Sequence, residues 1–191
     1  VLNDAAHSLG AWYKKGVRTG GETDVAIFSL HAVKNITTAE GGAICLNLPE
    51  PFNNEKLYCE LRQMSLNCQT KDAFSKSKAG GWRYDIVGLG MKINMADVNA
   101  AIGLAQIRKY DELLVERKRV FETYDNFFSK YKWAKLPPAE KDGRKTSYHI
   151  YALRIKDFSE DQRDEMINEI AQKDVAVNVH FIPMPMLSFF K

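Results

Sequence analysis

The stretch FSLHAVKNITTAEGGA, residues 28–43, decides how this chain is interpreted. The apolar run at residues 25–30 leads into it and predicts a β-strand. The strand delivers Ser29, His31 and Lys34 to a turn of small and polar residues. A strand that hands polar side chains to a loop is typical of an α/β protein whose loops carry the chemistry. Taken alone, Lys34 would be interpreted as a solvated loop charge.

A second informative stretch is NDAAHSLGA, residues 3–11. Here Asp4 leaves a short apolar segment and meets small residues, which permit the close approach of a flat ligand. The alternative for Asp4 is a turn or helix N-cap aspartate. The alternative for His7 is a structural histidine whose hydrogen bonds are satisfied.

Together and in this order, the two stretches resemble the DegT/StrS family of pyridoxal-phosphate-dependent nucleotide-sugar aminotransferases. That family has an aspartate followed three residues later by histidine or glutamine, and then a Ser-x-His-x-x-Lys-Asn motif before Glu-Gly-Gly. GMKINMADVNAAIGLAQ at residues 90–106 and VHFIP at residues 179–183 are similar to two further family segments. The resemblance covers almost the whole chain.

The resemblance implies a role for each matching residue at the cofactor. Lys34 corresponds to the lysine that holds pyridoxal 5'-phosphate as a Schiff base, and Asp4 to the partner of the pyridine nitrogen. Ser29 corresponds to a ligand of the cofactor phosphate. His7 corresponds to the residue near the phenolic oxygen.

The same resemblance implies a homodimer with shared active sites. Lys92 and Asn94 match a segment that reaches the phosphate and substrate region of the neighbouring subunit, although Lys92 is also consistent with a solvated turn lysine. His180 matches a residue that lies beside the substrate. The alternative for His180 is a histidine paired with backbone at the end of a strand, and both interpretations stay open.

The function implied is transamination of a nucleotide-linked keto sugar to an amino sugar, with glutamate as amino donor, in polysaccharide, lipopolysaccharide or antibiotic sugar biosynthesis. A sugar dehydratase of the same family is one alternative, but that branch has histidine in place of Lys34. A non-catalytic regulatory homologue is another, although a regulator would not need Asp4, His7, Ser29 and Lys34 together.

The implied fold is α/β, the fold type I of pyridoxal-phosphate-dependent transferases, which resembles aspartate aminotransferase. We expect residues 1–110 to form the C-terminal part of the large cofactor-binding domain. Residues 111–191 are expected to form a linking helix and an incomplete small α+β domain. Because apolar residues stand at both ends, we expect the chain to be a fragment. The resemblance implies that the fragment is the C-terminal half of a longer protein.

Composition narrows the classes of protein that remain. The chain has 191 residues, 45% of them hydrophobic and 27% charged, which is typical of a globular protein. Its net charge of +3 is small and spread along the chain, so neither nucleic acid nor an anionic membrane is expected as a partner. No apolar run is long enough to span a bilayer, and a cytoplasmic protein is expected. Cys45, Cys59 and Cys68 lack metal-site spacing, which predicts reduced packing cysteines and no metal site.

Periodicity predicts the remaining elements. Beside a strand at residues 42–46, residues 95–131 have helical periodicity with a break at residues 109–111, and two apolar stripes. The first stripe is Val98, Ala101, Ile102 and Ala105; the second is Tyr110, Leu113, Leu114, Arg117, Phe121, Tyr124 and Phe128. Strands are expected at residues 148–155 and 175–181. The helix between them, at residues 160–172, is expected to start with a capping box and to bury Met166, Ile167 and Ile170.

Overall fold

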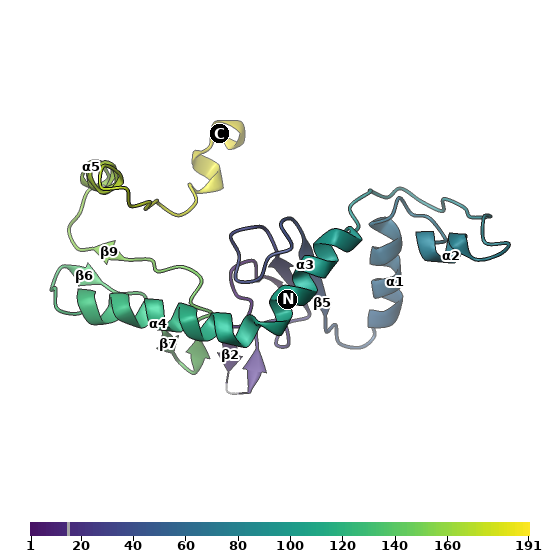
Figure 1. Ribbon diagram of the computed structural model, residues 1–191, viewed down its shortest axis with the longest axis horizontal. Coiled ribbons are helices and arrows are strands. Elements are labelled where there is room, and N and C mark those ends of the chain that lie inside the picture. The colour runs from purple at the N-terminus through teal and green to yellow at the C-terminus, as the bar shows by residue number, and fades with distance from the viewer. Residues whose placement is uncertain (15) are drawn as a thin grey trace.

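A computed structural model of the chain describes residues 1–14 and 16–191. Figure 1 shows an elongated arrangement around a small central sheet. Helices α1 (Asn54–Met64) and α2 (Ala73–Ser77) lie at one end. Helix α4 (Tyr110–Phe128) lies at the other end, with the C-terminal segment beside it in the view.

The central sheet has the strand order β1-β4-β5. Its strands are β1 (Leu2–Asp4), β4 (Val25–Ser29) and β5 (Gly42–Leu46). The first two run parallel, whereas β5 pairs with β4 in antiparallel fashion. The strands expected from the apolar runs at residues 25–30 and 42–46 are therefore confirmed. Ala5, which follows β1, forms a small buried core with Ala26 and Phe28 of β4.

Two consecutive helices follow, with the break where the sequence predicts it. Helix α3 (Asp97–Arg108) is capped by Lys109, and α4 begins at the next residue. The second apolar stripe faces inward over most of α4, where Phe121 is buried and packs edge-on against Tyr148 and Tyr151. Tyr124 is the exception and is 46% exposed.

The first apolar stripe does not face the body of this chain. Val98 is 74% exposed and Ile102 is 38% exposed. The face of α3 that meets the body instead carries Asn99, whose side-chain amide donates to the Thr38 carbonyl at 2.6 Å, and Gly103. A Cβ at Gly103 would lie 2.7 Å from the Thr38 methyl group, so the helix approaches the loop through a residue without a side chain.

A second sheet joins segments that are far apart in the sequence. Its order is β3-β2-β8-β7, and Trp12 pairs with Lys145. Two further strands, β6 and β9, form an antiparallel pair. The bounds are β2 (Trp12–Lys14), β3 (Val17–Arg18), β6 (Ala134–Lys135), β7 (Glu140–Lys141), β8 (Arg144–Lys145) and β9 (Arg154–Ile155).

Both strands expected in the C-terminal region are largely wrong. Of residues 148–155, only Arg154–Ile155 form a strand, because Tyr148 has φ = 54°, outside the β region, and its ring turns into the core. Residues 175–181 form no strand in the described chain. Their alternating valines are 39–51% exposed, and no strand among the described residues supplies the backbone hydrogen bonds that a ladder needs.

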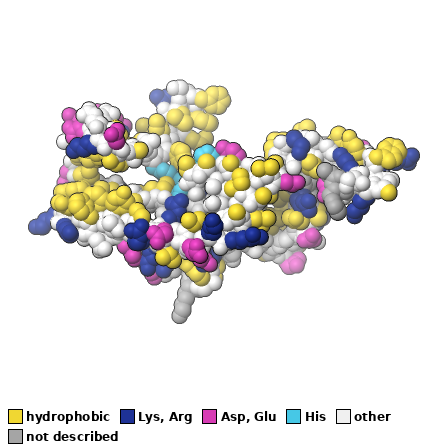
Figure 2. Space-filling view, viewed as in Figure 1, with side chains coloured by type: hydrophobic (Ala, Val, Ile, Leu, Met, Phe, Trp, Pro, Cys, Tyr) yellow, Lys and Arg dark blue, Asp and Glu magenta, His cyan; other side chains and the backbone are white. Residues whose placement is uncertain are grey.

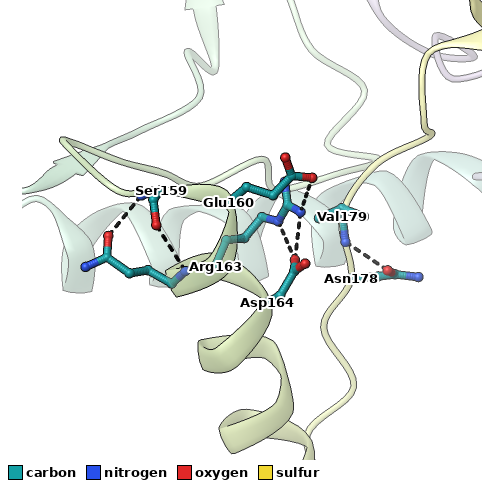
Figure 3. A network of polar contacts seen from close by, with 7 residues as sticks. Ser159, Glu160, Arg163, Asp164, Asn178 and Val179 are labelled. Carbon is teal, nitrogen blue, oxygen red and sulfur yellow. Dashed lines mark hydrogen bonds and ion pairs between the residues drawn. The ribbon is translucent and has the colours of Figure 1, made fainter. Parts of the chain in front are cut away.

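Helix α5 (Glu160–Ala171) begins as expected. Ser159 accepts from the Gln162 backbone and the Gln162 side chain accepts from the Ser159 backbone, which confirms the capping box (Figure 3). Arg163 joins Glu160 and Asp164 in the first turn. The expected inner face, Met166, Ile167 and Ile170, is half-buried. The 3-10 helices η1 (Met184–Met186) and η2 (Ser188–Phe190) follow.

Two sequence expectations concern membranes and cysteines. Across the described residues, the helices are too short or too polar to cross a membrane. All three cysteines are free, but only Cys68 is buried, and Cys59 lies exposed on α1. The expectation that Cys59 packs in the interior is therefore wrong, because α1 buries no side chain in this chain.

Candidate active site

The carboxyl ends of β1 and β4 place two of the expected site residues at one edge of the central sheet. Asp4 is the last residue of β1 and pairs with Ile27, two residues before Ser29 at the end of β4. Neighbouring parallel strands present their carboxyl ends together, which is where open α/β sheets bind ligands. The Asp4 carboxylate is exposed there and accepts from the Ala6 backbone at 3.1 Å.

A compact loop then delivers Lys34 to the same edge. Leu30 closes it, because its backbone donates to the Gly41 carbonyl at 2.8 Å and accepts from Thr38 at 2.9 Å. Inside the loop, the Lys34 backbone donates to the His31 carbonyl at 3.0 Å. The lysine is therefore held on an ordered turn, contrary to its interpretation as a solvated loop charge, and its side chain is only half-exposed.

The Lys34 amine contacts a ring nitrogen of His7. Lys34 Nζ and His7 Nε2 are 2.6 Å apart, which joins the two segments that the sequence singled out. Both side chains line a cavity of about 660 Å³. Its other walls come from the segments around residues 149–150 and 178–187.

Three imidazoles surround this point. The His7 ring lies 4.6 Å from the ring of His149 and 5.3 Å from that of His180. The Phe181 ring stacks on the His7 ring, with 6.2 Å between their centroids. Figure 2 shows histidine side chains gathered where the C-terminal segment meets the body of the protein. His180 therefore lies at the cavity, and the expectation of a strand end at this position is wrong.

The surroundings favour the neutral form of His7 and of His149. Burial lowers the pKa of His7, and the neighbouring Lys34 lowers it further. Burial also lowers the pKa of His149 to about 4, with contributions from His7, Arg117, Lys34 and His180. Buried His149 Nδ1 has no hydrogen-bond partner in the described structure, so a proton there would have no acceptor. A neutral His7 can accept a hydrogen bond from the Lys34 ammonium.

His149 is the site residue that the sequence did not reveal. It lies in the stretch SYHIY, residues 147–151, and the sequence predicts only a strand at residues 148–155 and no role for the histidine. The contact that matters joins residues 7 and 149 across most of the chain. No local pattern reports such a contact, and the only available signal was a histidine in an otherwise apolar segment.

Lys92 and Asn94 lie outside the lining of this cavity. Both are exposed, and the Lys92 amine donates to the Asn94 side-chain oxygen. The segment is held by backbone hydrogen bonds to residues 64, 65 and 67 at the end of α1. Within this chain, Asp4, His7, Ser29, Lys34 and His180 are brought to one region, whereas Lys92 and Asn94 are not.

The chain matches the model of the DegT/DnrJ/EryC1/StrS aminotransferase family over residues 1–191. It belongs to that family. A Campylobacter jejuni relative, UDP-4-amino-4,6-dideoxy-N-acetyl-beta-L-altrosamine transaminase, is 31% identical over 191 residues, which cover 100% of this chain and 47% of the relative. The Bacillus subtilis spore coat polysaccharide biosynthesis protein SpsC is 31% identical over 194 residues, with 100% and 48% covered.

Solved structures agree with this assignment. The Streptococcus pneumoniae sugar aminotransferase Spr1654, in its PMP form, superposes with a TM-score of 0.91 at 38% identity, with 99% of this chain and 47% of that chain covered. The same protein is solved in PLP and apo forms. The family and these forms indicate pyridoxal phosphate as the cofactor, consistent with fold type I. The chain spans about half the length of the relatives it matches.

The residues present fit this cofactor in their chemistry. An amine at Lys34, a carboxylate at Asp4 and a hydroxyl at Ser29 are the groups that an aldehyde, a pyridine nitrogen and a phosphate require. They lie at one sheet edge beside a cavity. Ala5, the residue after Asp4, is fully buried in the core with Ala26 and Phe28, which anchors the end of β1.

Proposed function

We propose that this chain carries the lysine side of an active site that transfers an amino group from glutamate to a nucleotide-linked keto sugar. The observation that carries the proposal is the Lys34 amine, which contacts His7 Nε2 at 2.6 Å on the wall of a cavity at the carboxyl edge of β1 and β4. When bound, pyridoxal phosphate supplies an electron sink for the carbanion formed as the α-proton leaves.

Each residue then has a distinct task. Lys34 holds the cofactor covalently and, when released, moves the proton as base and then acid. Asp4 keeps the ring nitrogen protonated through its negative charge. Ser29 donates to the phosphate, and His7 stands by the phenolic oxygen and the lysine. His180 holds the sugar substrate from the cavity wall.

The relatives support the substrate class. The Campylobacter jejuni protein is named for a UDP-linked amino sugar, and the Bacillus subtilis protein for a polysaccharide. A nucleotide-linked sugar in polysaccharide or lipopolysaccharide biosynthesis is therefore the substrate we propose. Of the alternatives, the dehydratase branch is disfavoured by Lys34 itself, and a non-catalytic role is disfavoured by the presence of Asp4, His7, Ser29 and Lys34 together.

We propose that the working unit is a homodimer in which Lys92 and Asn94 serve the neighbouring active site. Their position supports this, because they are exposed and lie outside the cavity that contains Lys34 in their own chain. We also propose the division into a large-domain part, residues 1–110, and a linking helix with a small domain, residues 111–191. The junction between α3 and α4 at Lys109 supports that boundary.

The proposal is tested by substituting the lysine. Lys34→Ala should abolish the absorption band of covalently bound cofactor and all sugar transamination, because no other amine lines the cavity among the described residues. Lys135→Ala, an exposed lysine on β6, is the matched control and should retain both. A Lys34→Ala enzyme that keeps the band and turns over at the original rate refutes the proposal.

A further inference from the structure

A closed loop of contacts leads from Lys34 back to itself through a serine outside every recognised motif. The next residue, Asn35, donates from its side-chain amide to the Ser147 carbonyl at 2.9 Å. The Ser147 hydroxyl donates to the His7 carbonyl at 2.9 Å. His7 Nε2 lies 2.6 Å from Lys34 Nζ, which closes the loop.

The two side chains that link the Lys34 loop to the His7 turn are buried. Ser147 is 2% exposed and Asn35 is 6% exposed, so water does not compete strongly for their hydrogen bonds. Asn35 also donates to the Leu9 carbonyl at 3.3 Å. The turn that carries His7 is thus held on one side by Ser147 and on the other by Asn35. Tyr110 adds a hydrogen bond from its hydroxyl to Leu9.

Fixing the His7 backbone fixes where its ring can lie. The rings of His149 and Phe181 both lie beside the His7 ring, so its remaining freedom is set mainly by the backbone from which it projects. A lysine reacts with an aldehyde through the lone pair on Nζ, so the position of Nζ decides whether that lone pair reaches the aldehyde carbon. The 2.6 Å contact with His7 Nε2 fixes this position.

We propose that Ser147 is a positioning residue, whose hydrogen bond to the His7 carbonyl holds the His7 ring against Lys34 and thereby fixes where the amine lies. Before it can condense with an aldehyde, the Lys34 ammonium gives one proton to solvent. The neutral amine would then give up its two hydrogens with the aldehyde oxygen as one water, so that only the carbon–nitrogen double bond is formed. The inference rests on the proposed function.

The test is the rate at which cofactor-free enzyme takes up pyridoxal phosphate, followed by absorbance. Ser147→Ala removes the hydroxyl but leaves the carbonyl that Asn35 uses, and should slow uptake about tenfold, less than the roughly hundredfold that a misplacement of about 1 Å can cost. Ser147→Thr keeps the hydroxyl and should restore the rate. If the alanine variant does not fold, Ser147→Cys replaces it, since a thiol is a weak donor of similar shape.

A double-mutant cycle separates positioning from general support of the fold. In a His7→Ala background, Ser147→Ala should slow uptake by less than about twofold, because the residue through which it acts is gone. Equal slowing in both backgrounds overturns the proposal, as does an alanine variant that matches the unsubstituted enzyme. Failure of the unsubstituted enzyme to attach cofactor at all would instead refute the proposed function.

Discussion

Substitution of His149 should change how the stability of the protein depends on pH. The ring lies in the cavity wall against His7, and burial lowers its pKa from 6.5 to about 4. In the unfolded chain the ring binds a proton below about pH 6.5, whereas in the folded protein it stays neutral down to about pH 4. The stability associated with the neutral ring is therefore fully present above pH 6.5 and is lost as the pH falls toward 4.

The size of the effect follows from this window. The full pKa difference corresponds to about 3 kcal/mol at 1.36 kcal/mol per unit. Only part of that stability is lost by about pH 5, and solvent reaches part of this half-buried ring. We therefore expect His149 to lower the free energy of unfolding by about 1 kcal/mol between about pH 7 and about pH 5. His149→Phe removes the titration and keeps a ring against His7.

The measurement is the free energy of unfolding in urea at the two pH values. The wild type should lose about 1 kcal/mol more than His149→Phe on acidification, since all other groups titrate in both proteins. The same substitution at His31, exposed beside Glu40, is the matched control and should leave the wild-type loss in place. Equal losses in wild type and His149→Phe would show that burial does not keep this histidine neutral.

Two further predictions concern the proposed chemistry. Asp4→Asn should retain cofactor but slow transamination by several kcal/mol in the barrier, at about 1.4 kcal/mol per tenfold, because an amide cannot stabilise a protonated ring nitrogen as a carboxylate does. Steady-state rates within about threefold of wild type would contradict this electrostatic role. Mixing inactive Lys34→Ala and Lys92→Ala subunits should restore about a quarter of wild-type activity after exchange, since one site per mixed dimer is intact. Exchange without recovered activity, with subunit mixing verified by differential tagging, would place Lys92 in its own site or in none.

The sequence by itself determined the family of the chain and much of its local structure. The order Asp4, His7, Ser29, Lys34 identified the family, and apolar runs marked β4 and β5 because those strands are short and contiguous in sequence. The break at Lys109 and the capping box at Ser159 were also predictable. Helix and cap signals depend on residues within about four positions of one another, so a sequence displays them directly.

Only the tertiary structure decided which distant residues complete the site. His149 and Ser147 reach His7 across more than a hundred residues, and nothing in SYHIY distinguishes a strand from a segment that turns at a left-handed Tyr148. The outward face of α3 was equally hidden, because an apolar stripe predicts burial without stating against what. Side-chain periodicity reports which residues share a face, whereas the packing of separate segments determines what that face meets.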